Sequence, residues 1–315
     1  MSPRAAMVLV ALLGRGCGLR AVVRRPGVVR CGSSSNPTAA ASEAFPRTKA
    51  GIPHGVCAVY KPPGWSSANV VAKVRGVLER AIKIPGQKKI KVKVGHGGTL
   101  DPLARGVLVI GVGHGCKEMQ GYLKGSKRYR AVALLGDETD TLDSEGTVVD
   151  SKPWDHVTRD RLEAALPHFT GDIRQVPPMF SALRKNGTRL YDLARKGIEV
   201  ERESRPVTIS GLALDDAGVG DSPGPLALPK FGLDVECSGG TYIRTLISDL
   251  AKHDAVDALA HMVELERTKQ GPFELGDCLH EDRWDFDAIC QHLLDSAPVA
   301  QRGLPPPGDA PEDDG

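Results

Sequence analysis

A glycine-rich stretch, GHGGTLDPLARG (residues 95–106), carries the side chains of this sequence that are best suited to chemistry. It contains one histidine, His96, and one aspartate, Asp101, and a carboxylate can act as a nucleophile or as a general base. A structural role is the alternative. Asp followed by Pro is a common helix start, in which Asp101 caps the helix and Leu103 and Val107 begin its apolar face. The two roles are compatible, and this stretch alone leaves both open.

Three further stretches carry residues that could serve the same chemistry. KGSKRYR surrounds Tyr129 with cations, which suits a nucleic-acid base stacked beside its phosphates, although a tyrosine at a strand edge is the alternative. CSGGTYIRTLISDL places Tyr242 and Arg244 directly after a Gly-Gly turn, where a helix is predicted to start. VYKPPGWSS ends a predicted strand on Lys61, in a turn made rigid by two prolines.

Nucleotide and metal motifs fail on their spacing. GVGHGCK resembles a phosphate-binding loop, but Cys116 stands where that motif needs glycine. In GDETDTLDSEG the aspartates lie three apart, whereas calcium loops alternate their ligands, so we expect a solvated loop. The seven cysteines are an odd number without a Cys-x-x-Cys pair, which indicates neither a disulfide framework nor a zinc site. We therefore expect no cofactor and no metal.

The elements that must position these residues alternate irregularly between strands and helices. Their order lacks strict βαβ alternation and predicts an α+β domain around a mixed sheet, with a loop insertion at 215–229. Strands are predicted at 55–61, 106–113, 127–136, 205–214 and 230–240, and helices at 68–81, 158–171, 188–197 and 241–253.

The two ends of the chain differ in composition from the middle. The first 42 residues hold six arginines and no lysine or acidic residue, which is typical of a mitochondrial transit peptide; a disordered tail is the alternative. We assign 1–50 to this leader, 51–296 to one catalytic domain and 297–315 to a disordered acidic tail. No apolar run is long enough to predict a membrane span.

Positive charge is clustered although the net charge is only +2. Such clusters are either solvated faces or strips that contact phosphates. The clustered cations are Lys83, Lys88, Lys89, Lys91 and Lys93, followed by Lys124, Lys127, Arg128 and Arg130.

The order of these motifs resembles that of the TruB-type tRNA pseudouridine synthases. The shared motifs are KPPGWSS, GHGGTLDPLARG, SKRYRA, TDTLDSEG, QVPPMFSALRKNG, LYDLARKGIEV, RPVTI and GGTYIRTLISDL, over residues 55–273. GHGGTLD, together with LERTKQGPF, is similar to the eukaryotic branch of the family. Little chain follows residue 273, so we expect the C-terminal PUA domain of bacterial members to be absent.

The resemblance implies a pseudouridine synthase fold, a mixed and mainly antiparallel sheet flanked by helices. It implies an isomerase that acts on the T-loop uridine of tRNA (position 55) without metal or redox cofactor. By position in the motifs, Asp101 is the catalytic aspartate, Arg244 pairs with it and Tyr129 stacks on the flipped base. The expected substrate-binding residues are His96, Tyr242, Leu265, Lys61, Lys127 and Arg128.

The same resemblance sets the expected partners. These are the T-arm of tRNA and messenger RNA with a similar loop, with Gly97, Gly98 and Gly106 admitting RNA backbone close to the chain. We expect a monomer in mitochondria, with the nucleus and cytosol as alternatives. A tRNA-binding or tRNA-folding module, in which catalysis is secondary, is the competing function.

Overall fold

The computed structural model describes residues 45–301, with gaps at 186 and 221. Most of the predicted leader and acidic tail therefore lies outside the described residues. The folded unit nevertheless extends past both predicted boundaries. Arg47 pairs with Asp287 at 2.7 Å, and α7 (Ala297–Ala300) buries Ala300 in the core.

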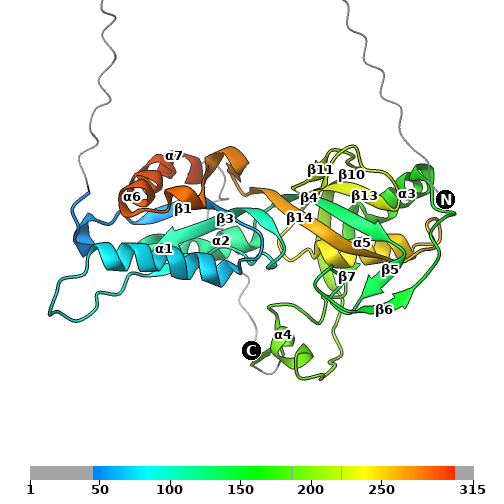
Figure 1. The fold of residues 1–315 in the computed structure, drawn as a ribbon, viewed down its shortest axis with the longest axis horizontal. Helices are drawn as coiled ribbons and strands as arrows, with labels where there is room; N and C mark the ends of the chain where they lie inside the picture. Colours follow the sequence, from blue (N-terminus) through cyan, green and yellow to red (C-terminus); the bar gives the residue numbers. More distant parts are fainter. Residues whose placement is uncertain (1–44, 186, 221, 302–315) are drawn as a thin grey trace, which may run out of the picture. The chain divides into compact units, whose positions relative to one another are not determined.

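One mixed sheet organises the fold (Figure 1). Its strand order is β16-β1-β3-β14-β4-β13-β10-β7, with β2 paired to β3 and β15 to β14. Of the pairings within this sheet, β1–β16 and β3–β14 are parallel and the others are antiparallel. The predicted mixed, mainly antiparallel α+β architecture is confirmed. The strands are β1 (Gly55–Lys61), β2 (Val94–His96), β3 (Arg105–Val112), β4 (Lys127–Leu135), β7 (Gly171–Gln175), β10 (Arg205–Leu214), β13 (Lys230–Cys237), β14 (Ala260–Gln270), β15 (Phe273–Glu274) and β16 (Cys278–Leu279).

Helices and small hairpins complete the fold. The helices besides α7 are α1 (Ser67–Ala81), α2 (Met119–Lys124), α3 (Arg159–Ala165), α4 (Leu190–Ala194), α5 (Ile243–Lys252) and α6 (Phe286–Asp295), with 3-10 turns η1 (Lys49–Gly51), η2 (Gly113–Lys117), η3 (Leu166–Phe169), η4 (Leu275–Asp277) and η5 (Glu281–Arg283). The hairpins are β5 (Asp137–Thr139) with β6 (Val148–Ser151), β8 (Arg184–Lys185) with β9 (Thr188–Arg189), and β11 (Gly218–Val219) with β12 (Ser222–Pro223). The predicted loop insertion thus contains a hairpin. The predicted helix at 158–171 is shorter because Pro167 lacks an N–H to continue it, and the chain goes on as η3.

Helix α1 begins at a serine cap. The Ser66 side chain accepts a hydrogen bond from the Asn69 backbone N–H at 3.1 Å, which satisfies one of the free donors of the first turn. The apolar side chains Val70, Val74 and Leu78 face α6 and one face of β1 and β3. Their spacing of three and four residues is what buries one side of a helix.

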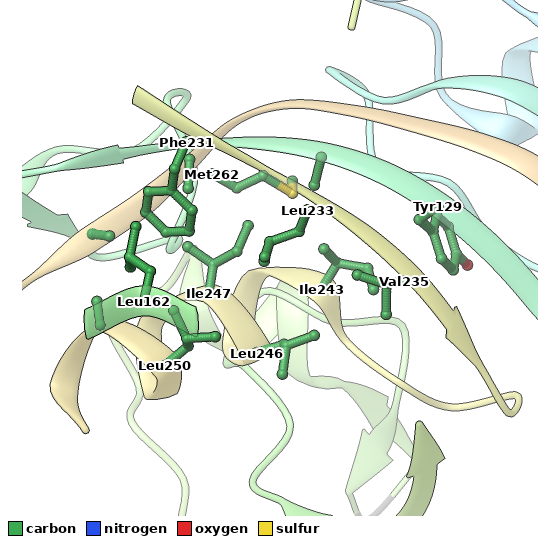
Figure 2. Packing of buried hydrophobic residues seen from close by; sticks show 14 of the residues in the cluster. Tyr129, Leu162, Phe231, Leu233, Val235, Ile243, Leu246, Ile247, Leu250 and Met262 are labelled. Carbon is green, nitrogen blue, oxygen red and sulfur yellow. The ribbon is translucent and has the colours of Figure 1, made fainter. Parts of the chain in front are cut away.

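A second core lies between α5 and the other half of the sheet (Figure 2). Leu246, Ile247 and Leu250 of α5 pack with Leu233 of β13, and all four are completely buried. Tyr129 of β4 belongs to the same cluster and lies at its margin in Figure 2. The core of α5 therefore fixes both the helix that carries Arg244 and the strand that carries Tyr129.

Candidate active site

Asp101 lies in an irregular loop and does not start a helix. The residues that follow form β3, which pairs with β1, β2 and β14, so Val107 lies in a strand. The helix-cap interpretation is therefore wrong, because the pairing of β3 with three strands, along both of its edges, outweighs the local Asp-Pro signal. The carboxylate of Asp101 therefore makes its hydrogen bonds with another part of the chain.

The partner of Asp101 is Arg244, the second residue of α5. Arg244 Nε donates to Oδ2 of Asp101 at 2.9 Å and Nη2 donates to Oδ1 at 3.1 Å. Two parallel bonds from one guanidinium fix both the position and the orientation of a carboxylate. The Arg244 side chain is 4% exposed and that of Asp101 is 30% exposed. A ligand can therefore reach the carboxylate while its counter-charge stays inside the protein.

Two backbone carbonyls fix the remaining donors of Arg244. Nη1 donates to the Thr141 carbonyl and Nη2 to the Phe180 carbonyl, both at 2.8 Å. Asp143 Oδ2 lies 3.6 Å from Arg244 Nε, and the Asp143 side chain is buried, which raises its pKa. The prediction of a solvated acidic loop is wrong, because the loop of Thr141 and Asp143 folds inward to complete the arginine site.

The KPPGWSS turn holds the loop of Asp101 from the other side. The Lys61 ammonium donates to the carbonyls of Pro62 and Pro102 at 3.0 Å and of Ala104 at 2.5 Å. The Ser67 hydroxyl accepts from the Leu100 N–H at 2.9 Å. Burial lowers the pKa of Lys61 to about 8. Lys61 is completely buried, so its predicted contact with substrate is replaced by a role in positioning the loop.

Strand β14 supports the glycine turn that precedes Asp101. Arg267 Nη2 donates to the Gly98 carbonyl at 3.3 Å, and Gln270 Nε2 donates to the Gly97 carbonyl at 2.6 Å. Burial and then the charge of Arg267 lower the pKa of His96, which is therefore neutral at neutral pH. His96 ends β2 beside this turn.

The glycines of this turn serve packing within the protein. A Cβ on Gly97 would lie 2.5 Å from the Tyr122 side chain, and one on Gly106 would lie 2.3 Å from the Arg267 carbonyl oxygen. Gly98 and Gly106 also have positive φ angles of 146° and 102°. The space at Gly97 and Gly106 is filled by the protein itself, which corrects the expectation that these glycines admit RNA backbone.

Two tyrosines lie close enough to Asp101 to interact with its charge. Burial raises the pKa of both Tyr129 and Tyr242, and the charge of Asp101 adds to the rise. Tyr242 precedes α5, and its backbone N–H donates to Gln175 Oε1 at 3.0 Å. Leu265 of β14 lies in the same cluster as Tyr129. The structure thus brings both tyrosines close to Asp101, and it places Leu265 in the cluster that contains Tyr129.

The structure does not bring Lys127 and Arg128 to this site. The Lys127 ammonium is buried and donates to the carbonyls of Leu123 and Gly125, both at 2.6 Å. Arg128 alternates with Tyr129 along β4 and therefore faces the other side of the sheet, where it pairs with Asp234 at 2.5 Å. A hollow of about 610 Å³ on that side is lined by Arg128 and Asp234 among others. Both residues were predicted to bind substrate, and neither lies where it can contact a base at Asp101.

Sequence reasoning missed the supports of the site. The carbonyls of Thr141 and Phe180 leave no signal in a sequence, because every residue carries one. Arg267 and Gln270 lie in the LERTKQG stretch (265–271), which is polar after Leu265 and gives no sign that these two side chains are buried. Among the residues that the structure describes, no three side chains of metal-ligating type are grouped. Within the same part of the chain, no helix is long and apolar enough to cross a membrane.

Comparison with known proteins gives a consistent result. A family model described as the N-terminal domain of TruB family pseudouridylate synthase matches residues 85–243. The chain is 46% identical over 246 residues to pseudouridylate synthase TRUB1 of Homo sapiens, a match that covers 76% of this chain and 67% of that protein. It is 45% identical over 223 residues to tRNA pseudouridine synthase B of Ectopseudomonas mendocina, covering 70% and 65%.

One solved structure shares the fold at a greater distance. A crystal structure of a Cbf5–Nop10–Gar1 complex contains a chain that matches with a TM-score of 0.50 and 27% identity. The match covers 73% of this chain and 53% of the other, so this chain spans about half the length of that protein.

Proposed function

The chain belongs to the TruB family of pseudouridylate synthases, and from this premise we propose that it isomerises the T-loop uridine of tRNA with Asp101 as its catalytic carboxylate. It is a tRNA pseudouridine synthase: its relative of 45% identity is named tRNA pseudouridine synthase B, and its relative of 46% identity is named pseudouridylate synthase TRUB1. One observation carries the assignment of Asp101: it is a partly exposed carboxylate fixed in two bonds by a buried arginine.

The reaction replaces one glycosidic bond by another, with no net gain or loss of atoms. The bond from C1′ of the ribose to N1 of uracil breaks, the base turns and C1′ bonds to C5. The proton on C5 then leaves to solvent, and N1 takes up a proton from solvent. Asp101 can attack the sugar, attack the base, or remove the sugar proton that opens a glycal route. Each route needs a carboxylate oxygen with a free lone pair, and the bidentate contact with Arg244 leaves a second lone pair on each oxygen of Asp101.

The neighbours of Asp101 suit a uridine that has left its stack. Extruding a base costs a few kcal/mol, and stacking on an aromatic ring offsets part of this cost. Tyr129 supplies such a ring, and Leu265 lies in the same apolar cluster. Neutral His96 can stack or hydrogen-bond without adding charge.

The test is tritium release from tRNA labelled at C5 of uridine, with EDTA present throughout. We expect release from the full transcript and none above background from a transcript with cytidine at the T-loop position. Tight binding without any release would favour the competing function, a tRNA-binding or tRNA-folding module.

The proposal extends to messenger RNAs with a loop shaped like the T-loop, because RNA recognition depends largely on the shape of unpaired segments. We further propose a monomer, because the exposed large apolar side chains of the described residues are spread over several elements.

Import into mitochondria rests on the arginine-rich leader, which lies outside the described residues. Imaging of the tagged full chain distinguishes mitochondria from nucleus and cytosol.

A further inference from the structure

The positive charge of this protein is concentrated around α1 and the chain that follows it. Residues 62–100 contain eight lysines and arginines and one carboxylate, whereas the whole chain has a net charge of only +2. The rest of the chain is therefore net negative. All eight cations are exposed: Lys73, Arg75, Arg80, Lys83, Lys88, Lys89, Lys91 and Lys93.

The single carboxylate of this region, Glu79 on α1, is turned inward. It is 7% exposed, its Oε2 lies 2.9 Å from Lys89 Nζ, and its Oε1 accepts from the Val92 N–H at 3.1 Å. Glu79 thus attaches residues 88–93, here called the lysine segment, to α1. It neutralises one lysine of the segment and leaves the others without a carboxylate from this region.

The lysine segment has one side packed and one side in solvent. Ile90 and Val92 contact the core beneath α1, while Lys91 and Lys93 are exposed. The backbone carbonyl of Lys93 also accepts from the Gly113 N–H at 2.8 Å. Packing on one side and these bonds hold the cations in place, which lowers the entropy lost when they bind an anion.

The lysine segment leads directly to the candidate active site. It continues into β2, which ends at His96, a few residues before Asp101. In Figure 1 the chain leaves the far end of α1 and returns alongside that helix. Helix α1 has 15 residues and is therefore about 22 Å long. The cations of α1 and of the lysine segment therefore extend from the edge of the site over a distance longer than one nucleotide.

We propose that the lysine segment is a second RNA-binding surface, which contacts the phosphate backbone of the substrate outside the loop that enters the site. A row of exposed cations with few carboxylate partners suits a polyanion. Contacts between these cations and phosphates supply affinity that does not depend on the base sequence. The inference rests on the proposed function for the identity of the RNA. Glu79 acts through the segment and is a positioning residue.

The test compares two double variants of the full chain that change the net charge equally. Lys88→Glu/Lys91→Glu reverses two of the four lysines of the segment, and Arg161→Glu/Arg283→Glu reverses two exposed cations on α3 and η5. We measure kcat and KM by tritium release, and tRNA binding by fluorescence anisotropy at several salt concentrations. The segment variant is expected to raise KM and Kd about 10-fold with kcat within about twofold, and to lower the salt slope by about 2. The control is expected to stay within about twofold.

Glu79→Ala separates the effect of attaching the lysine segment from the effect of net charge. The variant removes a negative charge, so simple attraction predicts tighter binding, whereas loss of the attachment predicts a higher KM and easier cleavage by trypsin at the segment. A KM within twofold of wild type for the segment variant, an equal rise in the control, or tighter binding by Glu79→Ala would each overturn the proposal. A wild type that binds tRNA through the segment but releases no tritium would leave this surface standing and contradict the proposed function instead.

Discussion

Cations serve opposite purposes in two neighbouring regions of this molecule. Around Asp101, the cations Lys61, Arg244 and Arg267 are buried, and they donate to carbonyls or to Asp101 itself. In the lysine segment the cations are exposed, and one buried carboxylate attaches them to α1. Burial therefore separates the cations that build the site from those that we propose bind RNA. The composition of the chain and the spacing of its residues do not distinguish the buried cations from the exposed ones.

The largest expected effect comes from removing the carboxylate that the buried cations position. Asp101→Asn keeps the shape of the side chain but loses its charge and its nucleophilic oxygen. We expect kcat to fall by about 10⁴-fold or more, with tRNA binding unchanged, because the phosphate contacts lie elsewhere. Tritium release and anisotropy on the same preparation measure both quantities. Turnover above about 1% of wild type would contradict the assignment of Asp101.

The next effect tests whether the guanidinium fork is needed or only its charge. Arg244→Lys keeps a cation but loses the two parallel bonds and the contacts with the Thr141 and Phe180 carbonyls. We expect kcat to fall by about 10²-fold while the protein stays folded, and Arg244→Gln to be at least as slow. Circular dichroism supplies the folding control. Near-normal turnover of Arg244→Lys would show that charge alone suffices.

The sequence predicts the fold and the pair at the centre of the site better than it predicts the surroundings. The strands and the amphipathic helices α1 and α5 follow from local periodicity. Asp101 and Arg244 are far apart in the chain, and only the motif resemblance connects them. Lys61 and Lys127 were assigned to substrate because a sequence shows their charge and not their burial. The inward fold of the Asp143 loop depends on an arginine about a hundred residues away, which no local pattern reveals.

A smaller effect, on stability more than on chemistry, is expected at Lys61. Lys61→Met preserves the length of the side chain and leaves three backbone carbonyls without their donor, one of them in a buried and two in partly buried hydrogen bonds. We expect the free energy of unfolding to fall by about 3 kcal/mol, since each acceptor left unpaired costs about 1 kcal/mol. Urea denaturation at pH 7 measures it. A variant as stable as wild type would show that the loop of Asp101 holds its shape without Lys61.

The pH dependence of this stability has a definite sign. The pKa of Lys61 is about 8 in the folded protein and 10.5 as its ordinary value. Between these values the unfolded chain binds the proton and the folded protein does not, so Lys61 adds stability as the pH rises. The destabilisation caused by Lys61→Met should therefore grow by about 2 kcal/mol from pH 8 to pH 10. Comparison with wild type cancels the other titrating groups, and a constant difference would mean that the pKa of Lys61 is not lowered.

The smallest effect is expected at Arg128, one residue from Tyr129 on the opposite side of β4. Arg128 is about half exposed and pairs with Asp234 beside the hollow on that side. An exposed pair of this kind contributes about 0–1 kcal/mol, so Arg128→Ala should leave the free energy of unfolding nearly unchanged. We expect its KM for tRNA to stay within about twofold of wild type, in contrast to the variant of the lysine segment. A rise of tenfold would make the hollow side of the sheet an RNA-binding surface. Since adjacent residues of a strand face opposite sides of a sheet, a single position on β4 separates a residue of the site from one that we expect RNA not to touch.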